Sequence, residues 1–269
     1  MEFVMFTKHL KRDGGLRLEE AGETISELGF AGADLTVRPQ GYIEPADARS
    51  ELTPAVEMLR AMDVSVPMLT TAITDHTDEA EVIFEVADAN DVGHLKLGYW
   101  LYDGLGTLDG GLEAMSADLA EIEVLSASYD VMPAVHIHSG PYLSAEAGIL
   151  ARVLDEFDPS LIGAYVDPGH MALEGARDGW KMGLDLLADR IEMVAVKDFT
   201  WRKTDDGWEK QLIGVDQGLV DWPSVFAFLA DIQFDGPVSF HSEYHHLSFN
   251  ELLDQTRRDL SYVQGIMAA

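Results

Sequence analysis

Histidines and carboxylates gather at the ends of apolar runs in this sequence. Asp167 and His170 follow the run 161–166, and His136 closes the run 131–135. A short apolar run bounded by polar and turn residues predicts a buried strand. Most of the histidines lie at or just beyond such a run, namely His9, His136, His138, His170, His241, His245 and His246. Chemistry is therefore expected where strands end.

The types of these side chains indicate a cation site. His136 and His138 share one face because side chains alternate along a strand, and so do His241 and Glu243. With Asp167 they form an imidazole and carboxylate set suited to Zn, Mn or Co. The chain has no cysteine, which excludes thiolate ligands. Two simpler interpretations stay open: each histidine is a hydrogen-bonded core residue, and Asp167 is a turn former that caps nearby amides.

Lys197 and Asp198 close another apolar run, 191–196. Three roles are open for Lys197: polarising a substrate carbonyl or phosphate, forming an imine, or pairing with Asp198 at a barrel rim. The first role would make Lys197 a catalytic residue.

Four further residues are expected to contact substrate. Arg38 and His9 lie just beyond apolar runs, where they could hold an anionic or polyhydroxy molecule, although an arginine at a rim is often simply solvated. His170 would act beside the metal or on the substrate. Trp100, in a loop rich in glycine and aromatic residues, could cover the apolar face of a sugar or anchor the loop.

Strand-like and helix-like segments alternate along the whole chain. The expected strands are 4–6, 32–37, 63–69, 94–98, 131–138, 161–166, 191–198 and 237–243. Helical spacing follows each of them, for example over 77–90 with Thr77 as N-cap. Eight such units predict an α/β fold, a single (β/α)8 TIM barrel spanning 1–269, with a small hairpin inserted at about 199–218. A doubly wound open sheet is disfavoured because no G-x-G-x-x-G follows the first strand.

Composition limits the functional classes. The chain has 48 acidic and 18 basic residues and a net charge of −30, which repels nucleic acid and anionic membrane surfaces. The acidic residues are scattered through every segment, which favours a halophile-type cytoplasmic protein over an acidic mesophilic enzyme. No apolar run approaches the roughly 20 residues that span a bilayer. A homo-oligomer stays open.

Several segments together resemble the xylose isomerase-like barrels, which include sugar isomerases, tagatose epimerase-like enzymes and endonuclease IV repair enzymes. The segments are 34–41, Val166-Asp-Pro-Gly-His170, Val196-Lys-Asp198, 212–222 and 236–243, and the Asp-x-Gly-His motif is the most specific. The resemblance implies a metal held by Glu, Asp, His and Glu on strands five to eight. Here only Asp167 matches, while His136, Ala195 and His241 stand at the other three positions.

The resemblance implies an isomerase or epimerase that acts on a small sugar or keto-sugar through a divalent metal. In this interpretation His136, Asp167 and His241 bind the metal, and Ala195 leaves one side open. Glu243 is the base, while Lys197 or His138 stabilises the enediolate. The altered ligands leave three alternatives: a metal-free site, a lyase, dehydratase or aldolase with Lys197 as the electrophilic group, and a non-catalytic sugar-binding barrel.

Overall fold

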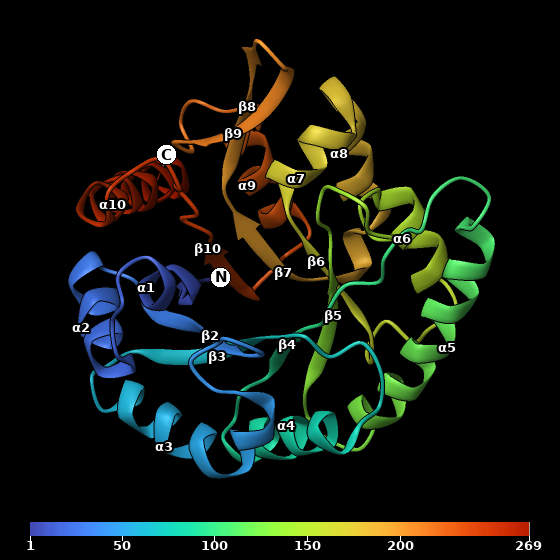
Figure 1. Ribbon diagram of the computed structural model, residues 1–269, viewed down its shortest axis with the longest axis horizontal. Helices are drawn as coiled ribbons and strands as arrows, with labels where there is room; N and C mark the ends of the chain where they lie inside the picture. Colours follow the sequence, from blue (N-terminus) through green and yellow to red (C-terminus); the bar gives the residue numbers. More distant parts are fainter. Residues whose placement is uncertain (269) are drawn as a thin grey trace.

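The computed structural model describes the backbone of residues 1–268, and their side chains except those of 176 and 177. Eight parallel strands close into a barrel in the order β1-β10-β7-β6-β5-β4-β3-β2 (Figure 1). Their bounds are β1 Glu2–Phe6, β2 Gly32–Val37, β3 Ser65–Thr71, β4 His94–Lys96, β5 Met132–His136, β6 Gly163–Val166, β7 Ile191–Val196 and β10 Pro237–Phe240. The predicted TIM barrel is confirmed.

Helices surround the strands on the outside of the barrel (Figure 1). They are α1 Lys8–Arg12, α2 Leu18–Leu28, η1 Pro45–Asp47, α3 Ala48–Arg60, α4 Asp78–Ala89, α5 Leu108–Ser126, α6 Ala147–Leu154, α7 Pro168–Glu174, α8 Ala176–Leu186, η2 Ala188–Arg190, α9 Trp222–Asp231 and α10 Phe249–Met267. Thr77 caps α4 as expected, because its side chain accepts a hydrogen bond from the Ala80 amide at 3.1 Å. None of the described helices combines the length and apolarity needed to cross a membrane.

Two apolar clusters hold the barrel together. The larger one fills the space between the strands and the helix ring. The smaller one lies inside the barrel and consists of Val4, Met68, Ala134, Tyr165, Met193 and Ala195. Ala195 is fully buried there. The sequence predicts that Ala195 leaves an open side at a metal. In the structure no such opening lies at Ala195, because the side chains of the smaller cluster pack against it.

Some strands end earlier than predicted. Strand β5 ends at His136 and β10 at Phe240, so His138, His241 and Glu243 lie in the loops beyond them. Helix α7 begins directly after Asp167, where the sequence analysis expected only a turn. Asp167 is its N-cap, accepting the His170 amide at 3.0 Å, and proline stands at the first helical position.

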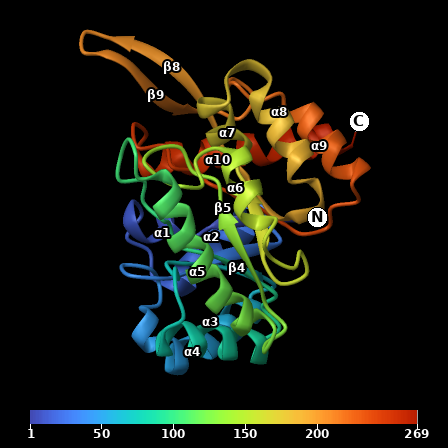
Figure 2. The ribbon, with the colours of Figure 1, turned by 90° about the vertical axis from the view of Figure 1, so that its right-hand side faces the viewer.

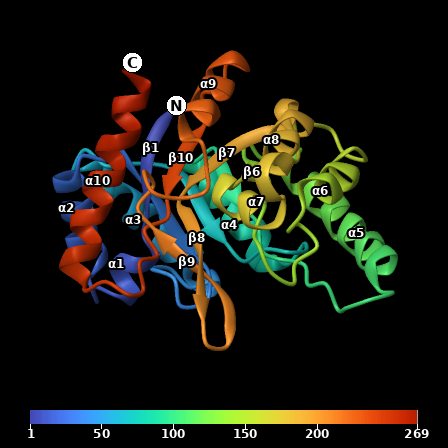
Figure 3. The same cartoon turned by 90° about the horizontal axis from the view of Figure 1, so that it is seen from above.

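A two-stranded hairpin, β8 (Asp198–Thr204) and β9 (Gly207–Ile213), occupies the interval in which the sequence indicates an insertion. It projects from the barrel on the side opposite the N terminus (Figures 2 and 3). Trp201 and Trp208 stand on it with 45% and 65% of their surface exposed. Lys210 fixes the hairpin to the barrel rim by donating a hydrogen bond to Ser139 Oγ at 2.9 Å.

Candidate active site

A cavity of about 290 Å³ opens at the C-terminal ends of the strands. This is the end at which TIM barrels carry their active sites. Six residues predicted from the sequence line it: Arg38, His136, His138, Lys197, His241 and Glu243. The remaining lining residues are Phe6, Lys8, Thr70, Lys96, Tyr99 and Tyr142. The cavity therefore joins side chains from seven of the eight β-then-α units.

The Lys197 ammonium group lies at the centre of the polar side chains. Its Nζ is 3.0 Å from Asp167 Oδ2, 3.5 Å from Glu243 Oε2 and 3.3 Å from His241 Nδ1. Only 1% of the Lys197 side chain is exposed. A charge buried this deeply is stable only with partners, and the two carboxylates provide them. Lys197 consequently pairs with Asp167 and Glu243, and not with Asp198 as one sequence interpretation proposed.

Asp167 has two roles in the structure. One carboxylate oxygen caps α7, and the other faces the Lys197 ammonium group and His136 Nε2, which is 3.3 Å away. Burial raises the pKa of Asp167, and the positive charge of Lys197 opposes that shift. The turn-former interpretation and the functional interpretation therefore both describe this residue.

The rings of His136 and His241 have both nitrogens engaged. His136 Nε2 donates to Asp167, and Nδ1 accepts from the Tyr99 hydroxyl at 2.9 Å. His241 Nδ1 accepts from Lys197, so Nε2 donates to the Tyr165 hydroxyl at 2.8 Å. Burial, and then the charge of Lys197, hold the pKa of each histidine well below its usual range. Both imidazoles are neutral near pH 7.

These contacts do not fit a divalent metal. A metal ligand must present a free lone pair, and neither imidazole does so toward the carboxylate of Asp167. The Lys197 ammonium group lies where the predicted cation would lie, between Asp167, His241 and Glu243. Within residues 1–268, no group of three or more His, Cys, Asp or Glu side chains has the geometry to hold a metal ion. Of the sequence-predicted ligands, Asp167 and His241 thus contact an ammonium group, and His136 contacts Asp167.

Glu243 lies on the cavity wall between two lysines. Its carboxylate contacts Lys8 Nζ at 2.8 Å and Lys197 Nζ at 3.5 Å, and 17% of its side chain is exposed. Burial alone would raise the pKa of Glu243, but the two ammonium groups outweigh burial and hold this pKa well below its usual range. Glu243 is therefore an ionised carboxylate that faces the cavity.

His138 presents one ring nitrogen to the cavity. Its Nδ1 donates to the backbone carbonyl of Ser139 at 3.0 Å, which leaves the lone pair on Nε2 in the neutral ring. Burial, followed by the charge of Lys197, lowers the pKa of His138 to about 3. His138 is thus a neutral hydrogen-bond acceptor at neutral pH.

A family model for the xylose isomerase-like TIM barrel matches residues 23–265. The chain belongs to this family. Solved structures with the same fold include 3-keto-D-glucoside 4-epimerase from E. coli, with a TM-score of 0.73 and 14% identity over 98% of this chain and 99% of that one. No curated protein matches the sequence significantly.

Two further structures show how widely this fold is shared. The probable 3-DHS dehydratase of Bacillus anthracis has a TM-score of 0.75 and 13% identity, covering 98% of this chain and 99% of that one. A xylose isomerase-like TIM barrel protein from Mycobacterium smegmatis, in complex with magnesium, has a TM-score of 0.69 and 11% identity, covering 92% and 87%. Identities this low show the fold alone.

Three residues expected to contact substrate lie elsewhere in this xylose isomerase-like barrel. His9 is fully buried in α1 against the Phe6 ring, and neither ring nitrogen has a hydrogen-bond partner among the described residues. His170 lies beneath the cavity, with Nδ1 2.8 Å from Ser139 Oγ. Trp100 donates to Asp118 on α5 at 2.8 Å and so anchors its loop. None of the three lines the cavity, because each side chain packs into the barrel wall or the helix layer.

Two buried ionisable residues near the cavity are not among the site residues predicted from the sequence. Lys96 ends β4 and lines the cavity, and Asp34 lies inside β2. Asp34 accepts hydrogen bonds from the hydroxyls of Thr70 (2.7 Å) and Ser239 (2.8 Å), and burial raises its pKa to about 6. The available signal was a charged residue within an otherwise apolar strand, since such residues are rarely buried without a functional or structural partner.

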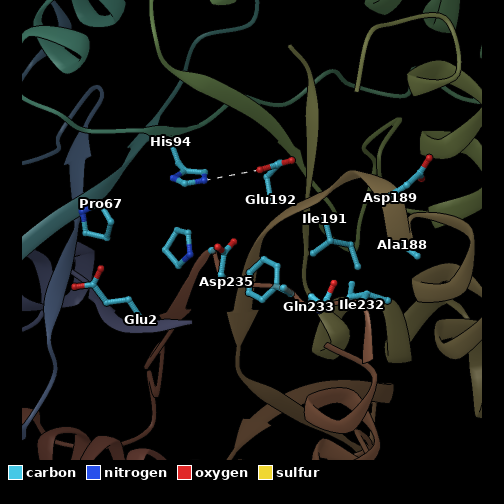
Figure 4. Close-up of a pocket in the computed structure, with 13 residues that line it drawn as sticks. Glu2, Pro67, His94, Ala188, Asp189, Ile191, Glu192, Ile232, Gln233 and Asp235 are labelled. Atoms are coloured by element: carbon cyan, nitrogen blue, oxygen red, sulfur yellow. Dashed lines mark ion pairs between the residues drawn. The ribbon is translucent and has the colours of Figure 1, made fainter. Parts of the chain in front are cut away.

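A second hollow of about 530 Å³ lies at the opposite end of the barrel, where the strands begin. Figure 4 shows His94 and Glu192 facing each other there, with Nε2 and Oε2 3.9 Å apart. Burial, and then nearby Asp235, raise the pKa of Glu192 to about 7. The strand-end histidines and lysines that predict chemistry are absent from its described lining, so we place the active site at the other end.

Proposed function

We propose that this xylose isomerase-like barrel is an isomerase or epimerase that moves a proton at the carbon next to the carbonyl of a small sugar or keto-sugar. The observation that carries the proposal is the pair formed by the Lys197 ammonium group and the Glu243 carboxylate, 3.5 Å apart on one cavity wall. The Lys197 ammonium group can stabilise negative charge that develops on a substrate oxygen. The Glu243 carboxylate is an ionised base next to it.

The side chains support a short reaction sequence. The substrate carbonyl oxygen accepts a hydrogen bond from Lys197 Nζ, and Glu243 removes the proton from the adjacent carbon. The electron pair moves onto the carbonyl oxygen, forming an enediolate that Lys197 stabilises. Returning the proton to the former carbonyl carbon, together with transfer of the hydroxyl proton to the former carbonyl oxygen, completes an isomerisation. Protonation of the original carbon on its opposite face by a water molecule, while Glu243 releases its proton to solvent, completes an epimerisation. His138 Nε2 accepts from a substrate hydroxyl and orients it.

No step above is assigned to a metal, since the described donors do not fit one. Lys197 supplies the positive charge that the sequence analysis assigned to Zn, Mn or Co. The same geometry disfavours an imine at Lys197, because its Nζ is already engaged by two carboxylates. Reductive trapping with borohydride should therefore leave Lys197 unmodified.

The test is exchange of substrate hydrogen for solvent deuterium. The protein, purified in high salt, is incubated in D2O with D-psicose, D-fructose, a 3-keto-glucoside and the phosphate esters of the first two, and NMR follows loss of the proton next to the carbonyl. We expect exchange with at least one compound. Glu243→Gln should reduce the exchange rate about 100- to 10,000-fold, the contribution of a general base. Glu23→Gln is the matched control, since it makes the same substitution at an exposed position on α2, outside the cavity, and should leave the exchange rate unchanged.

Other outcomes select the alternatives. Loss of water from the substrate, detected as an unsaturated product, would identify a lyase or dehydratase that uses the same enediolate. Binding of sugars without exchange under any added cation would identify a non-catalytic sugar-binding barrel and overturn the proposal. Exchange that appears only after a divalent metal is added would restore the metal-dependent mechanism.

A further inference from the structure

Lys96 is a buried cation without a counter-ion. It is 3% exposed at the end of β4, and its Nζ lies 3.7 Å from the centre of the Tyr99 ring, on the cavity side. No carboxylate of the described residues lies within ion-pairing distance of it. The ring face provides a cation–π contact, which stabilises an ammonium group less than a carboxylate does.

Arg38 lines the same cavity from the loop after β2. Its Nε is buried and has no hydrogen-bond partner among the side chains and backbone that the structure describes. A guanidinium group normally satisfies its planar set of donors with carboxylate, phosphate or carbonyl oxygens. Arg38 thus has a deficit related to that of Lys96: Arg38 has a buried donor without an acceptor, and Lys96 has an ammonium group without a carboxylate partner.

The cavity therefore holds two kinds of cationic side chain. Lys8 and Lys197 are paired with Glu243, and Lys197 also with Asp167. Arg38 and Lys96 are not paired with any described carboxylate. The acid near them is Asp34, but its two oxygens already accept hydrogen bonds from Thr70 and Ser239.

An added anion would resolve both deficits. Burial, and then the charge of Arg38, lower the pKa of Lys96 well below its usual value; Asp34 opposes this shift, whereas Lys197 and Lys8 add to it. A negative group near both Arg38 and Lys96 would favour the charged ammonium form of Lys96. It would also accept a hydrogen bond from the free Arg38 Nε–H. Such an acceptor has to come from a ligand.

We propose that Arg38 and Lys96 form a subsite that binds a carboxylate or phosphate group of the substrate. The subsite lies in the same cavity as Lys197 and Glu243, so one small substrate can contact both pairs of residues. The volume of about 290 Å³ limits the substrate to a small molecule. Assigning the anion to the substrate rests on the proposed function, whereas anion binding by Arg38 and Lys96 does not.

The experiment measures binding of inorganic phosphate and of acetate by isothermal titration at constant KCl, without turnover. The parent should bind at least one of the two, and the stronger binder identifies phosphate or carboxylate as the preferred group. Lys96→Met and Arg38→Met should each weaken that binding about ten- to hundredfold, the effect of losing one charge-assisted hydrogen bond. Arg38→Lys keeps the charge without the fork and should lose less.

Lys203→Met is the matched control, because Lys203 is exposed on the hairpin strand β8 and its loss should leave binding unchanged. A melting temperature accompanies each titration. Removing an unpaired buried cation should not lower the melting temperature of Lys96→Met, whereas removing a purely structural lysine would. Unchanged anion affinity in both Lys96→Met and Arg38→Met, or no binding of either anion by the parent, overturns the proposal. Failure of the proposed function appears separately, as absent deuterium exchange.

Discussion

At the C-terminal end of the strands the cavity wall holds four cationic side chains and one carboxylate, whereas the hollow at the opposite end holds four carboxylates and neither Lys nor Arg among its described residues. The cations are Lys8, Arg38, Lys96 and Lys197, and the carboxylates of the far end are Glu2, Asp189, Glu192 and Asp235. The chain has only 18 basic residues at a net charge of −30. Placing four of them at one mouth makes that mouth a local positive region that attracts anionic or strongly polar molecules.

The charges at the two ends also differ in their surroundings, since those at the mouth include a pair inside the fold and those at the far end partly face solvent. At the mouth, Lys197 and Asp167 are both buried and neutralise each other at 3.0 Å. At the far end, Glu192 is 29% exposed and its partner His94 is 3.9 Å away. Removing one member of the buried pair Lys197–Asp167 should therefore destabilise the protein, whereas removing the charge of Glu192 should stabilise it.

The largest effect is expected for Lys197→Met. This change keeps the unbranched apolar stem of the side chain but leaves Asp167 as an unpaired buried charge, which typically costs about 3–5 kcal/mol of the free energy of unfolding. Urea denaturation in high salt measures it. Adding Asp167→Asn to the same chain removes the orphaned charge and should recover a large part of that loss, although deuterium exchange stays abolished.

Lys181→Met provides the control for losing a lysine at the surface, since 45% of the Lys181 side chain is exposed. Its stability should match that of the parent within about 0.5 kcal/mol. If Lys197→Met were as stable as Lys181→Met, the ammonium group would not be the charge that holds Asp167, and the proposed mechanism would lose its central residue.

Much of this mouth could be predicted from the sequence. The sequence predicts the end of the barrel at which Asp167, Lys197 and His136 lie. Each of them closes or follows an apolar strand, and parallel strands all end on the same side of the barrel. The pairing of Lys197 with Asp167 and Glu243 could not be predicted, since it depends on the direction in which a flexible four-carbon side chain folds.

The errors have local causes. His9 follows β1 in the chain, but the short helix α1 turns it into the core against Phe6. Trp100 follows the end of β4 in the sequence, but its indole N–H donates a hydrogen bond to Asp118 of helix α5. Lys96 was not predicted as a site residue because its place at the end of β4 does not show which way the side chain points, and only the closed barrel shows that its amine reaches a cavity.

Salt should have an intermediate effect, and it acts on the surface more than on the mouth. Repulsion among 48 acidic residues is screened within ~3 Å at about 1 M salt, against ~10 Å at about 0.1 M. The melting temperature should therefore rise between about 0.1 M and about 2 M KCl. Circular dichroism during heating measures this change. A melting temperature that does not change would mean that the acidic surface is tolerated without screening, contrary to a halophile-type protein.

The smallest effect is expected at the far end, for Glu192→Gln. The pKa of Glu192 is raised to about 7 from an ordinary value of 4.5, so the folded state binds this proton more tightly than the unfolded state does. Between those two values the parent loses stability as pH rises, because ionisation is easier after unfolding. Glutamine does not titrate, so Glu192→Gln should be more stable than the parent at pH about 8, by about 1–2 kcal/mol after allowance for solvent screening. That difference should disappear near pH 4.5.

Urea denaturation at both pH values, in the same KCl concentration, tests this. Glu23→Gln on α2 controls for the loss of one exposed carboxylate. The variant should keep the deuterium exchange of the parent, since Glu192 lies at the start of β7, away from the cavity that contains Lys197. A Glu192→Gln protein with the same pH dependence of stability as the parent would show that the carboxylates of the far end are already relaxed by solvent. The two ends of the barrel would then differ in their effect on folding as well as in the sign of their charges, because only the buried pair at the mouth would contribute to stability.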